Sequence, residues 1–333
     1  MKKFKVAIIG IGHDHAIPAI NSLKKQSNIF DIAGYVLPEG EKEKFPERMH
    51  VLDGIKELDI NTIMNDPEIP AVVIELEDMH LAKYALLAAE HKKHIQMDKP
   101  GGTNLDEFEK LIKTVKKNNV VFHTGYMYRY NPFITEAIEK VKSGVYGNVI
   151  SVEAQMNCKH NPDKRQWLSN FPGGMMFYLG CHLIDLVLQL QGQPERIIPL
   201  NKCSGFDGVT GEDFGMAVFE YKNGVSFVKT TAVEKGGYAR RQLVINCEKG
   251  TVEIKPLEMQ DNNGNHFTEQ VTYTSNDWFD RGAYSKSDMY DRYDDMLADF
   301  VPMVYGEKEN PITPDYEIEL YKTLLKCCGK YEL

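Results

Sequence analysis

Short apolar runs alternate with amphipathic stretches of helical spacing through the first third of this 333-residue chain, and this alternation constrains the fold more than any other feature. The apolar runs, expected to be strands, are residues 6–11, 29–37, 71–76, 94–98 and 120–126, and the helical stretches include residues 16–25, 81–93 and 106–117. Strands joined by helices of this length form right-handed β-α-β units and a parallel sheet. The sequence therefore predicts an α/β, doubly wound N-terminal domain over residues 1–124, with ligands bound at the carboxyl ends of its strands.

The pattern changes after residue 124. Two helical stretches, 131–144 and 177–192, are followed by strand-like runs that are separated by turn residues, at 196–200, 214–221, 225–233, 241–247 and 251–255. Residues 261–288 are polar and irregular, so we expect a long loop there, and two helices follow it. Hairpin turns such as KNG at 222–224 favour antiparallel pairing. We therefore predict a second domain over residues 125–333, an α+β domain with a mainly antiparallel sheet.

Composition limits the kind of partner. The formal net charge is −9 and the pI is about 5.6, which disfavours nucleic acid and anionic membrane surfaces as partners. The six cysteines include no C-x-x-C pair, so we expect neither a disulfide framework nor a cysteine metal site, and the protein is expected in the reducing cytoplasm. No apolar run approaches the ~20 residues of a membrane span.

The stretch IIGIGHDHA at residues 8–16 resembles a dinucleotide-binding turn with one relaxed position. Gly10 would permit the tight turn and Gly12 the close approach of a pyrophosphate, while His15 replaces the third small residue of G-x-G-x-x-G. The acidic residue that usually clamps the ribose is absent from the end of the second strand, where Glu39 is the first carboxylate, so the choice between NAD and NADP is left open. No metal is expected at His13 and His15, because residues two apart on a helix point to different faces.

Four further stretches join this turn in a fixed order. They are VVIEL with His80, DKP at 98–100, YRYNP at 128–132, and the glycine pair followed by a helix with His182 and Asp185. Together they resemble the Gfo/Idh/MocA family of NAD(P)-dependent oxidoreductases over essentially the whole chain.

The resemblance implies an N-terminal Rossmann domain, a C-terminal substrate and oligomerisation domain, and hydride exchange between NAD or NADP and a sugar, cyclitol or related polyol. It implies a homodimer or homotetramer, and it carries the catalytic roles to Lys99 and His182. Histidine can take a hydroxyl proton near neutral pH, and a lysine can stabilise the developing alkoxide. The implied cofactor-binding residues are Gly10, Gly12, His13, Asp14, His15, Glu75, Glu77, His80 and Lys99.

The chain departs from the family pattern in ways that bear on its reaction. Tyr178 stands where many members carry an aspartate one turn before the histidine, and we expect it to act as a hydrogen-bonding member of the catalytic set; Asp185 could orient His182 from the other side. Glu75 and Glu77 replace small residues. The expected substrate-binding residues are Tyr126, Arg129, Arg165, Trp167 and Asp185. Two other functions remain open from the sequence, a cofactor-binding sensor without turnover and a lyase or epimerase that retains NAD.

Overall fold

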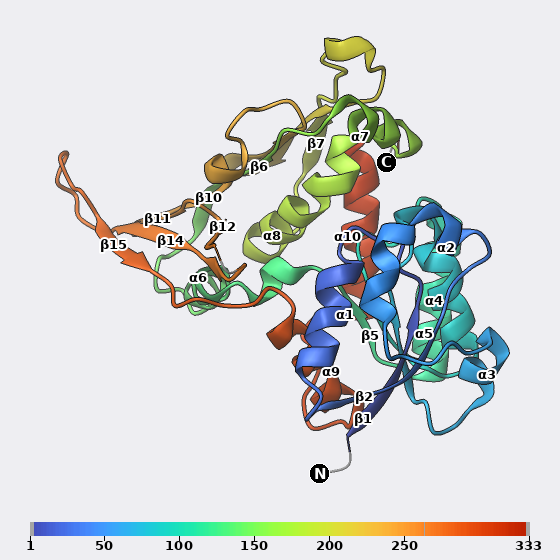
Figure 1. Ribbon diagram of the computed structural model, residues 1–333. Coiled ribbons are helices and arrows are strands. Elements are labelled where there is room, and N and C mark those ends of the chain that lie inside the picture. The colour runs from blue at the N-terminus through green and yellow to red at the C-terminus, as the bar shows by residue number, and fades with distance from the viewer. Residues whose placement is uncertain (1–2, 263, 331–333) are drawn as a thin grey trace. The chain divides into compact units, whose positions relative to one another are not determined.

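A computed structural model describes residues 3–262 and 264–330 of the chain, and these form two compact units (Figure 1). The first unit comprises residues 1–127 and 293–321, and the second comprises residues 128–292 and 322–333. Residues 293–321 thus belong to the first unit, and the second crossing between units falls inside the last helix, α10 (Pro314–Cys327).

The first unit is built on the predicted parallel sheet. Its strands are β1 (Phe4–Ile9), β2 (Phe30–Val36), β3 (Ala71–Ile74), β4 (His94–Met97) and β5 (Phe122–Thr124), in the order β2-β1-β3-β4-β5. All four pairings are parallel. β3 is buried along its whole length, as expected for a strand covered on both faces. The doubly wound fold is confirmed, with its strand ends gathered at one edge.

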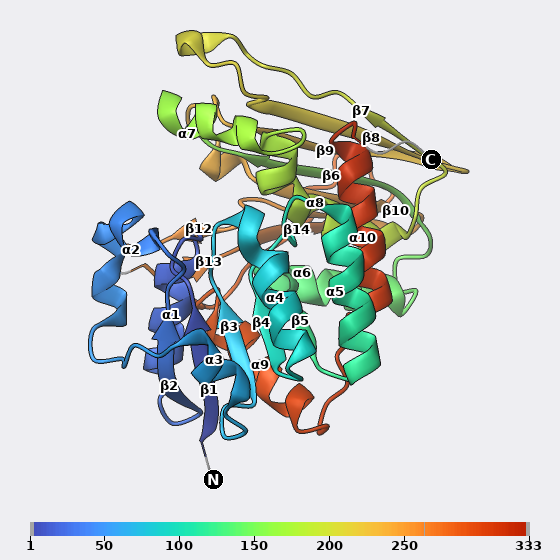
Figure 2. The same ribbon diagram turned by 90° about the vertical axis from the view of Figure 1, so that its right-hand side faces the viewer.

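Helices cover both faces of this sheet (Figure 2). α4 (Leu81–Glu90) and α5 (Leu105–Asn118) pack together on one face, while α1 (Ala16–Lys25) and α9 (Asp294–Val304) lie on the other. α9 is fixed there by the edge contact of Phe300 with Phe4 and by a 2.6 Å hydrogen bond from Ser22 to Asp294. Short helices that the pattern did not predict are α2 (Glu41–Lys44), η1 (Pro46–Leu52), α3 (Ile60–Asn65) and η2 (Asp78–His80).

The second unit contains an eight-stranded sheet, with strands in the order β15-β14-β11-β10-β6-β9-β8-β7. Only β6 and β9 pair in parallel, so the sheet is mainly antiparallel as predicted. α8 (Cys181–Gln191) packs against the central strands and α6 (Pro132–Lys142) lies beside it (Figure 1). The strands are β6 (Val149–Asn157), β7 (Arg196–Pro199), β8 (Phe214–Tyr221), β9 (Gly224–Thr231), β10 (Gln242–Cys247), β11 (Gly250–Ile254), β14 (Glu269–Tyr273) and β15 (Ala283–Lys286).

The expectation of a loop over residues 261–288 was wrong. β14 and β15 lie in this segment and extend the sheet at one edge, and β13 (His266–Phe267) pairs with β12 (Met259–Gln260) beside them. β15 is mostly exposed, so its stability comes from the backbone ladder and it shows no apolar alternation.

The single helix expected over residues 177–192 also differs in the structure. A π-helical turn, η5 (Met176–Gly180), precedes α8, and the helix then ends at Gly192 with φ +73°. The remaining elements are α7 (Pro162–Trp167), η3 (Met127–Tyr130), η4 (Leu168–Asn170), η6 (Phe206–Gly208) and η7 (Tyr238–Arg240). None of the six cysteines, all of which are described, forms a disulfide. Within the described residues, no helix is both long and apolar enough to span a membrane.

Candidate functional site

The turn after β1 has the backbone of a dinucleotide-binding turn. Gly10 adopts φ +81°, a conformation that favours glycine, and its amide donates to the carbonyl of Val36 at 2.9 Å. At Gly12, a β-carbon would lie 2.6 Å from Oε1 of Glu41 and 2.9 Å from the amide nitrogen of Glu77. Only glycine therefore fits at both positions.

A carboxylate of the chain itself occupies the anion position of this turn. The Ile11 amide donates to Oε2 of Glu41 at 3.2 Å, and the backbone of Gly12 interacts with the same carboxyl group. Backbone amides of this kind bind phosphate oxygens at dinucleotide sites, so the Glu41 oxygens stand in for an oxygen of a pyrophosphate. The turn thus fits the phosphates of a nicotinamide cofactor, but Glu41 must leave before they can bind.

The environment of Glu41 disfavours its charge. Burial raises the pKa of this carboxyl to about 7; the nearby charge of Glu77 adds to the increase, while the amides and Arg48 oppose it. Glu77 in turn forms an ion pair with Lys44 at 2.7 Å. Near neutral pH, the Glu41 carboxyl is therefore divided between its protonated and ionised forms.

Arg48 binds the backbone carbonyl groups of the turn. Its Nη1 atom donates to the carbonyls of Gly12 and His13 at 2.8 and 2.7 Å, and its Nη2 atom donates to Asp14 at 3.1 Å. Sequence reasoning missed both Arg48 and Glu41. They lie on η1 and α2, which carry no motif, and only the chain path after β2 returns them to the turn.

Five side chains form a histidine–carboxylate cluster at the carboxyl ends of β1, β3 and β4: His13, His15, Glu75, Asp78 and Asp98. Nδ1 of His13 and Nδ1 of His15 lie 3.1 and 3.0 Å from Oδ2 of Asp98. Nε2 of His13 lies 3.7 Å from Asp78. The two rings converge because residues 13–15 form a turn before α1 and not part of the helix, so the argument that they would point to different faces does not apply.

The cluster has strongly unequal charges. Burial alone would lower the pKa of His13, but the negative charges of Asp98 and Asp78 raise it to about 10. Burial lowers the pKa of His15, with His13 and Lys99 adding to the decrease. Burial and the charge of Asp98 raise the pKa of Glu75 well above its ordinary value. The charged form of the imidazole is therefore favoured at His13 and disfavoured at His15, and the neutral form of the carboxyl group is favoured at Glu75.

Lys99 lies next to this cluster and is 1% exposed. Its amide donates to Oδ1 of Asp98 at 2.7 Å, and its positive charge contributes to lowering the pKa of Asp78. The lysine is thus a buried charge at the carboxyl edge of the sheet. Of the other residues expected to bind cofactor, Asp14 contacts Arg48, Glu77 covers Gly12, and His80 is exposed at the end of η2.

A pocket of about 650 Å³ opens at the carboxyl end of β2. Three of its lining residues are acidic, namely Glu39, Glu57 and Asp59, and none of its described lining residues is lysine or arginine. Tyr84 also lines this pocket. Its pKa is raised mainly by burial and secondly by the charge of Glu41, so Tyr84 lies between the pocket and the carboxyl group in the glycine turn. Carboxylates in the pocket can accept hydrogen bonds from the hydroxyl groups of a ligand, and their negative charge would repel a phosphate group.

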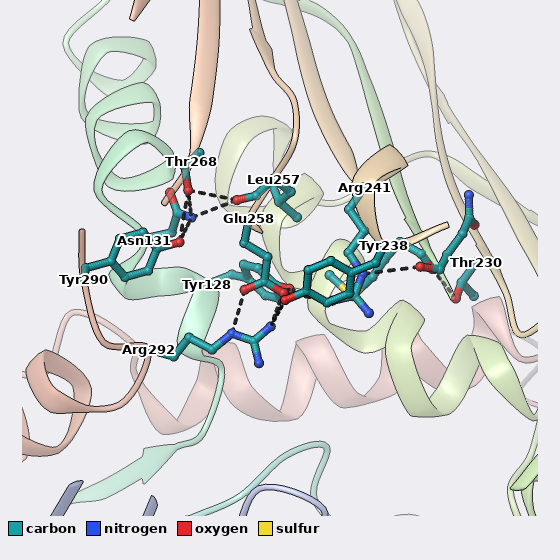
Figure 3. A network of polar contacts seen from close by, with 12 residues as sticks. Tyr128, Asn131, Thr230, Tyr238, Arg241, Leu257, Glu258, Thr268, Tyr290 and Arg292 are labelled. Atoms are coloured by element: carbon teal, nitrogen blue, oxygen red, sulfur yellow. Dashed lines mark hydrogen bonds and ion pairs between the residues drawn. The ribbon is translucent and has the colours of Figure 1, made fainter. Parts of the chain in front are cut away.

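In the second unit, His182 is buried on α8 at 1% exposure and contacts the edge of the Tyr128 ring. The Tyr128 hydroxyl donates to Glu258, a buried carboxylate that also binds Arg241 at 2.8 Å and Arg292 (Figure 3). This network restricts the ring that packs on His182. Sequence reasoning missed Glu258, which follows β11 without a motif.

The other residues predicted in this unit are held by neighbours within it. Asp185 forms two contacts with Arg129, at 2.9 and 3.0 Å. Arg165 is 2% exposed and pairs with Asp213. The ring of Tyr178 lies in the π-helical turn and packs against that of Trp167, and Lys164 lies over both rings. Tyr126, in the first unit, is 2% exposed.

A Rossmann-type sheet, a double-glycine turn whose amides hold a carboxyl group, and a buried lysine at the strand ends define a nucleotide-binding protein of the dehydrogenase class. Two family models match the chain. Residues 4–126 match "Oxidoreductase family, NAD-binding Rossmann fold", and residues 134–253 match "GFO/IDH/MocA C-terminal domain". The chain belongs to the Gfo/Idh/MocA family, as its sequence motifs indicated, and its first unit is an NAD-binding Rossmann domain.

Curated relatives include oxidoreductase P35 of Formosa agariphila, 31% identical over 58% of this chain and 61% of that protein. The myo-inositol 2-dehydrogenase of Thermotoga maritima is 22% identical over 66% of each chain. The chain thus spans less than two thirds of the length of these relatives. Among solved structures, a levoglucosan dehydrogenase in complex with NADH and levoglucosan superposes with a TM-score of 0.79 at 17% identity, covering 99% of this chain and 98% of that one. This likeness supports the fold.

Proposed function

We propose that this protein is an NAD-dependent dehydrogenase that oxidises a hydroxyl group of a sugar, cyclitol or related polyol. The observation that carries the proposal is Lys99, a buried ammonium group at the carboxyl end of a parallel sheet whose glycine turn holds the Glu41 carboxyl group. Relatives named for their action on inositol and levoglucosan support the substrate class.

The reaction moves a hydride from a carbinol carbon and a proton from its oxygen, which leaves a carbonyl group. A bound nicotinamide would supply the hydride acceptor. Lys99 would stabilise the negative charge that develops on the substrate oxygen, and His182 would accept the proton. The Tyr128 ring, fixed by Glu258, would position the His182 imidazole. Tyr178 is proposed as a hydrogen-bonding residue of the same set.

The acidic pocket at the end of β2 supports a preference for NAD over NADP. Glu39, Glu57 and Asp59 can accept hydrogen bonds from ribose hydroxyls, whereas a 2′-phosphate would meet three carboxylates. The sequence left this choice open because the acidic clamp was missing from its usual position. Glu57 and Asp59 lie 21 and 23 residues beyond the end of β2 and reach the pocket only in the folded chain.

Reduction of NAD at the nicotinamide absorbance, measured against a panel of sugars, inositols and sugar acids, tests the proposal. Lys99→Met and His182→Gln should each lower turnover by about 10²–10⁴-fold while leaving the affinity for NADH within a fewfold of wild type. Lys113→Met, on the exposed face of α5, is the matched control and should retain turnover.

Three outcomes would contradict the proposal. Turnover at the wild-type rate in a Lys99→Met, His182→Gln double variant would remove both residues from the mechanism. Binding of NADH without reduction of NAD on any substrate, or product formation without net reduction, would instead favour the sensor or the lyase and epimerase functions.

A further inference from the structure

We propose that His13, His15 and Asp98 bind a divalent transition-metal ion of the zinc type, with Glu75 and Asp78 completing its surroundings. This inference rests on the geometry of the histidine–carboxylate cluster and does not depend on the proposed dehydrogenase activity.

The three residues present one potential ligand atom each, and these atoms all lie within 4.8 Å of one another. The two closest approaches, from each imidazole Nδ1 to Oδ2 of Asp98, are 3.1 and 3.0 Å. Bonds of about 2.0–2.2 Å to a tetrahedral zinc ion place its ligands about 3.4 Å apart, so the site closes on an ion with side-chain shifts of roughly an ångström. Two of the three residues are almost fully buried, and the His15 side chain is 15% exposed.

Polar atoms around this trio lack hydrogen-bond partners. Oε2 of Glu75 is buried and makes no hydrogen bond. Nε2 of His13 and Oδ1 of Asp78 are also buried and face each other at 3.7 Å, which is an ion pair beyond hydrogen-bond distance; each of these residues is at most 2% exposed. Leaving such an atom unsatisfied in a buried site is costly, and unsatisfied groups of this kind call for an unrecorded ligand. The three are also of the types that bind transition metals.

Nδ1 of His13 lies 3.1 Å from the amide nitrogen of His15 and 3.1 Å from Oδ2 of Asp98. As an imidazolium, His13 donates the proton on this atom to the Asp98 carboxylate. A zinc ion would take the place of that proton between Nδ1 and the carboxylate, because a histidine ligand must be deprotonated.

The donor set selects the class of ion. Two imidazoles and a carboxylate suit zinc, cobalt, nickel or iron, whereas calcium and magnesium prefer oxygen ligands throughout. Three protein ligands would leave a further position for Glu75, Asp78 or water, in the immediate neighbourhood of the positive charge of Lys99.

Direct metal binding tests this site. Protein without an affinity tag is stripped with a chelator and dialysed against Zn²⁺ or Co²⁺, and bound metal is measured by mass spectrometry. We expect one ion per chain, a visible d–d absorption of the Co²⁺ form, and a higher Tm with Zn²⁺ but not with Mg²⁺. His15→Gln should weaken Zn²⁺ binding by roughly 100-fold or more, since the loss of even an outer-sphere partner costs 10- to 100-fold. His91→Gln, at an exposed histidine after α4, should bind as wild type does.

The side chain of His15 is the partly exposed member of the trio, which makes its substitution the mildest test of folding. Asp98→Asn provides a second variant, and circular dichroism establishes that each is folded. Wild-type protein that takes up no more Zn²⁺ than His15→Gln, with no change in Tm, would overturn the proposal and leave the cluster as a proton-sharing network. Equal loss of binding in His91→Gln would also overturn it. Metal content and Tm are read without substrate, so a failed dehydrogenase assay leaves this result unaffected.

Discussion

Binding of NADH should tighten about tenfold between pH 6 and pH 8, because Glu41 has to leave the glycine turn when the cofactor phosphates enter it. The carboxyl is 7% exposed in the turn, where it has a pKa of about 7, and its ordinary value is 4.5. Once displaced into solvent, it should return towards that ordinary value. The closed turn therefore binds more protons than the open one between these two pKa values.

The sign and size of the effect follow from this difference. Lowering the pH protonates Glu41 while it is buried, which stabilises the closed turn and weakens cofactor binding. Taking 7 as the pKa of the buried form and full ionisation of the displaced form, the apparent Kd at pH 6 should be roughly ten times that at pH 8, or about 1.4 kcal/mol. Raising the pH further should bring little gain, because the buried carboxyl is then ionised as well.

NADH fluorescence titrations at pH 6, 7 and 8 and constant ionic strength measure this dependence. Glu41→Gln cannot titrate and should flatten it, whereas Glu43→Gln, an exposed neighbour on α2, should leave it unchanged. The groups that face Glu41 are Glu77, Arg48 and Tyr84, and all remain in both variants. The reasoning is refuted if Glu41→Gln keeps the wild-type slope, or if wild-type binding tightens as the pH falls.

Three other perturbations test separate parts of the site. Glu39→Arg should narrow the preference for NADH over NADPH by about tenfold, because it places a cation in the acidic pocket; unchanged affinities for both cofactors would argue against a ribose site there. Arg129→Met should lower the free energy of unfolding by about 3–5 kcal/mol in urea melts, since it leaves Asp185 buried without its cation. The ion pair of Arg196 with Glu220 is exposed, so Arg196→Met should lower the free energy of unfolding by at most about 1 kcal/mol. Tyr178→Asp should preserve or raise turnover if the phenol only orients His182, the proposed proton acceptor, and a large loss would give the phenol a role of its own.

Local patterns in the sequence were sufficient for the Rossmann architecture. A buried parallel strand must be apolar along its length, and a connecting helix must carry an apolar stripe, so β1, β3, α1 and α5 appear directly as periodicities. The double-glycine turn was equally visible, because only glycine tolerates both its backbone angle at residue 10 and the close contacts at residue 12. The edge strand β15 was missed because it is exposed and needs no apolar pattern.

The chemistry of the site, by contrast, was decided by tertiary structure. Glu41 and Arg48 follow the end of β2 by 5 and 12 residues and look like ordinary surface charges in the sequence, yet the chain path folds them onto the glycine turn. His13, Glu75 and Asp98 are each the first polar residue after a different strand, and their mutual distances exist only because a parallel sheet brings those strand ends to one edge. Periodicity records which face of an element is buried. It does not record which charges meet there, and that depends on contacts between residues far apart in the chain.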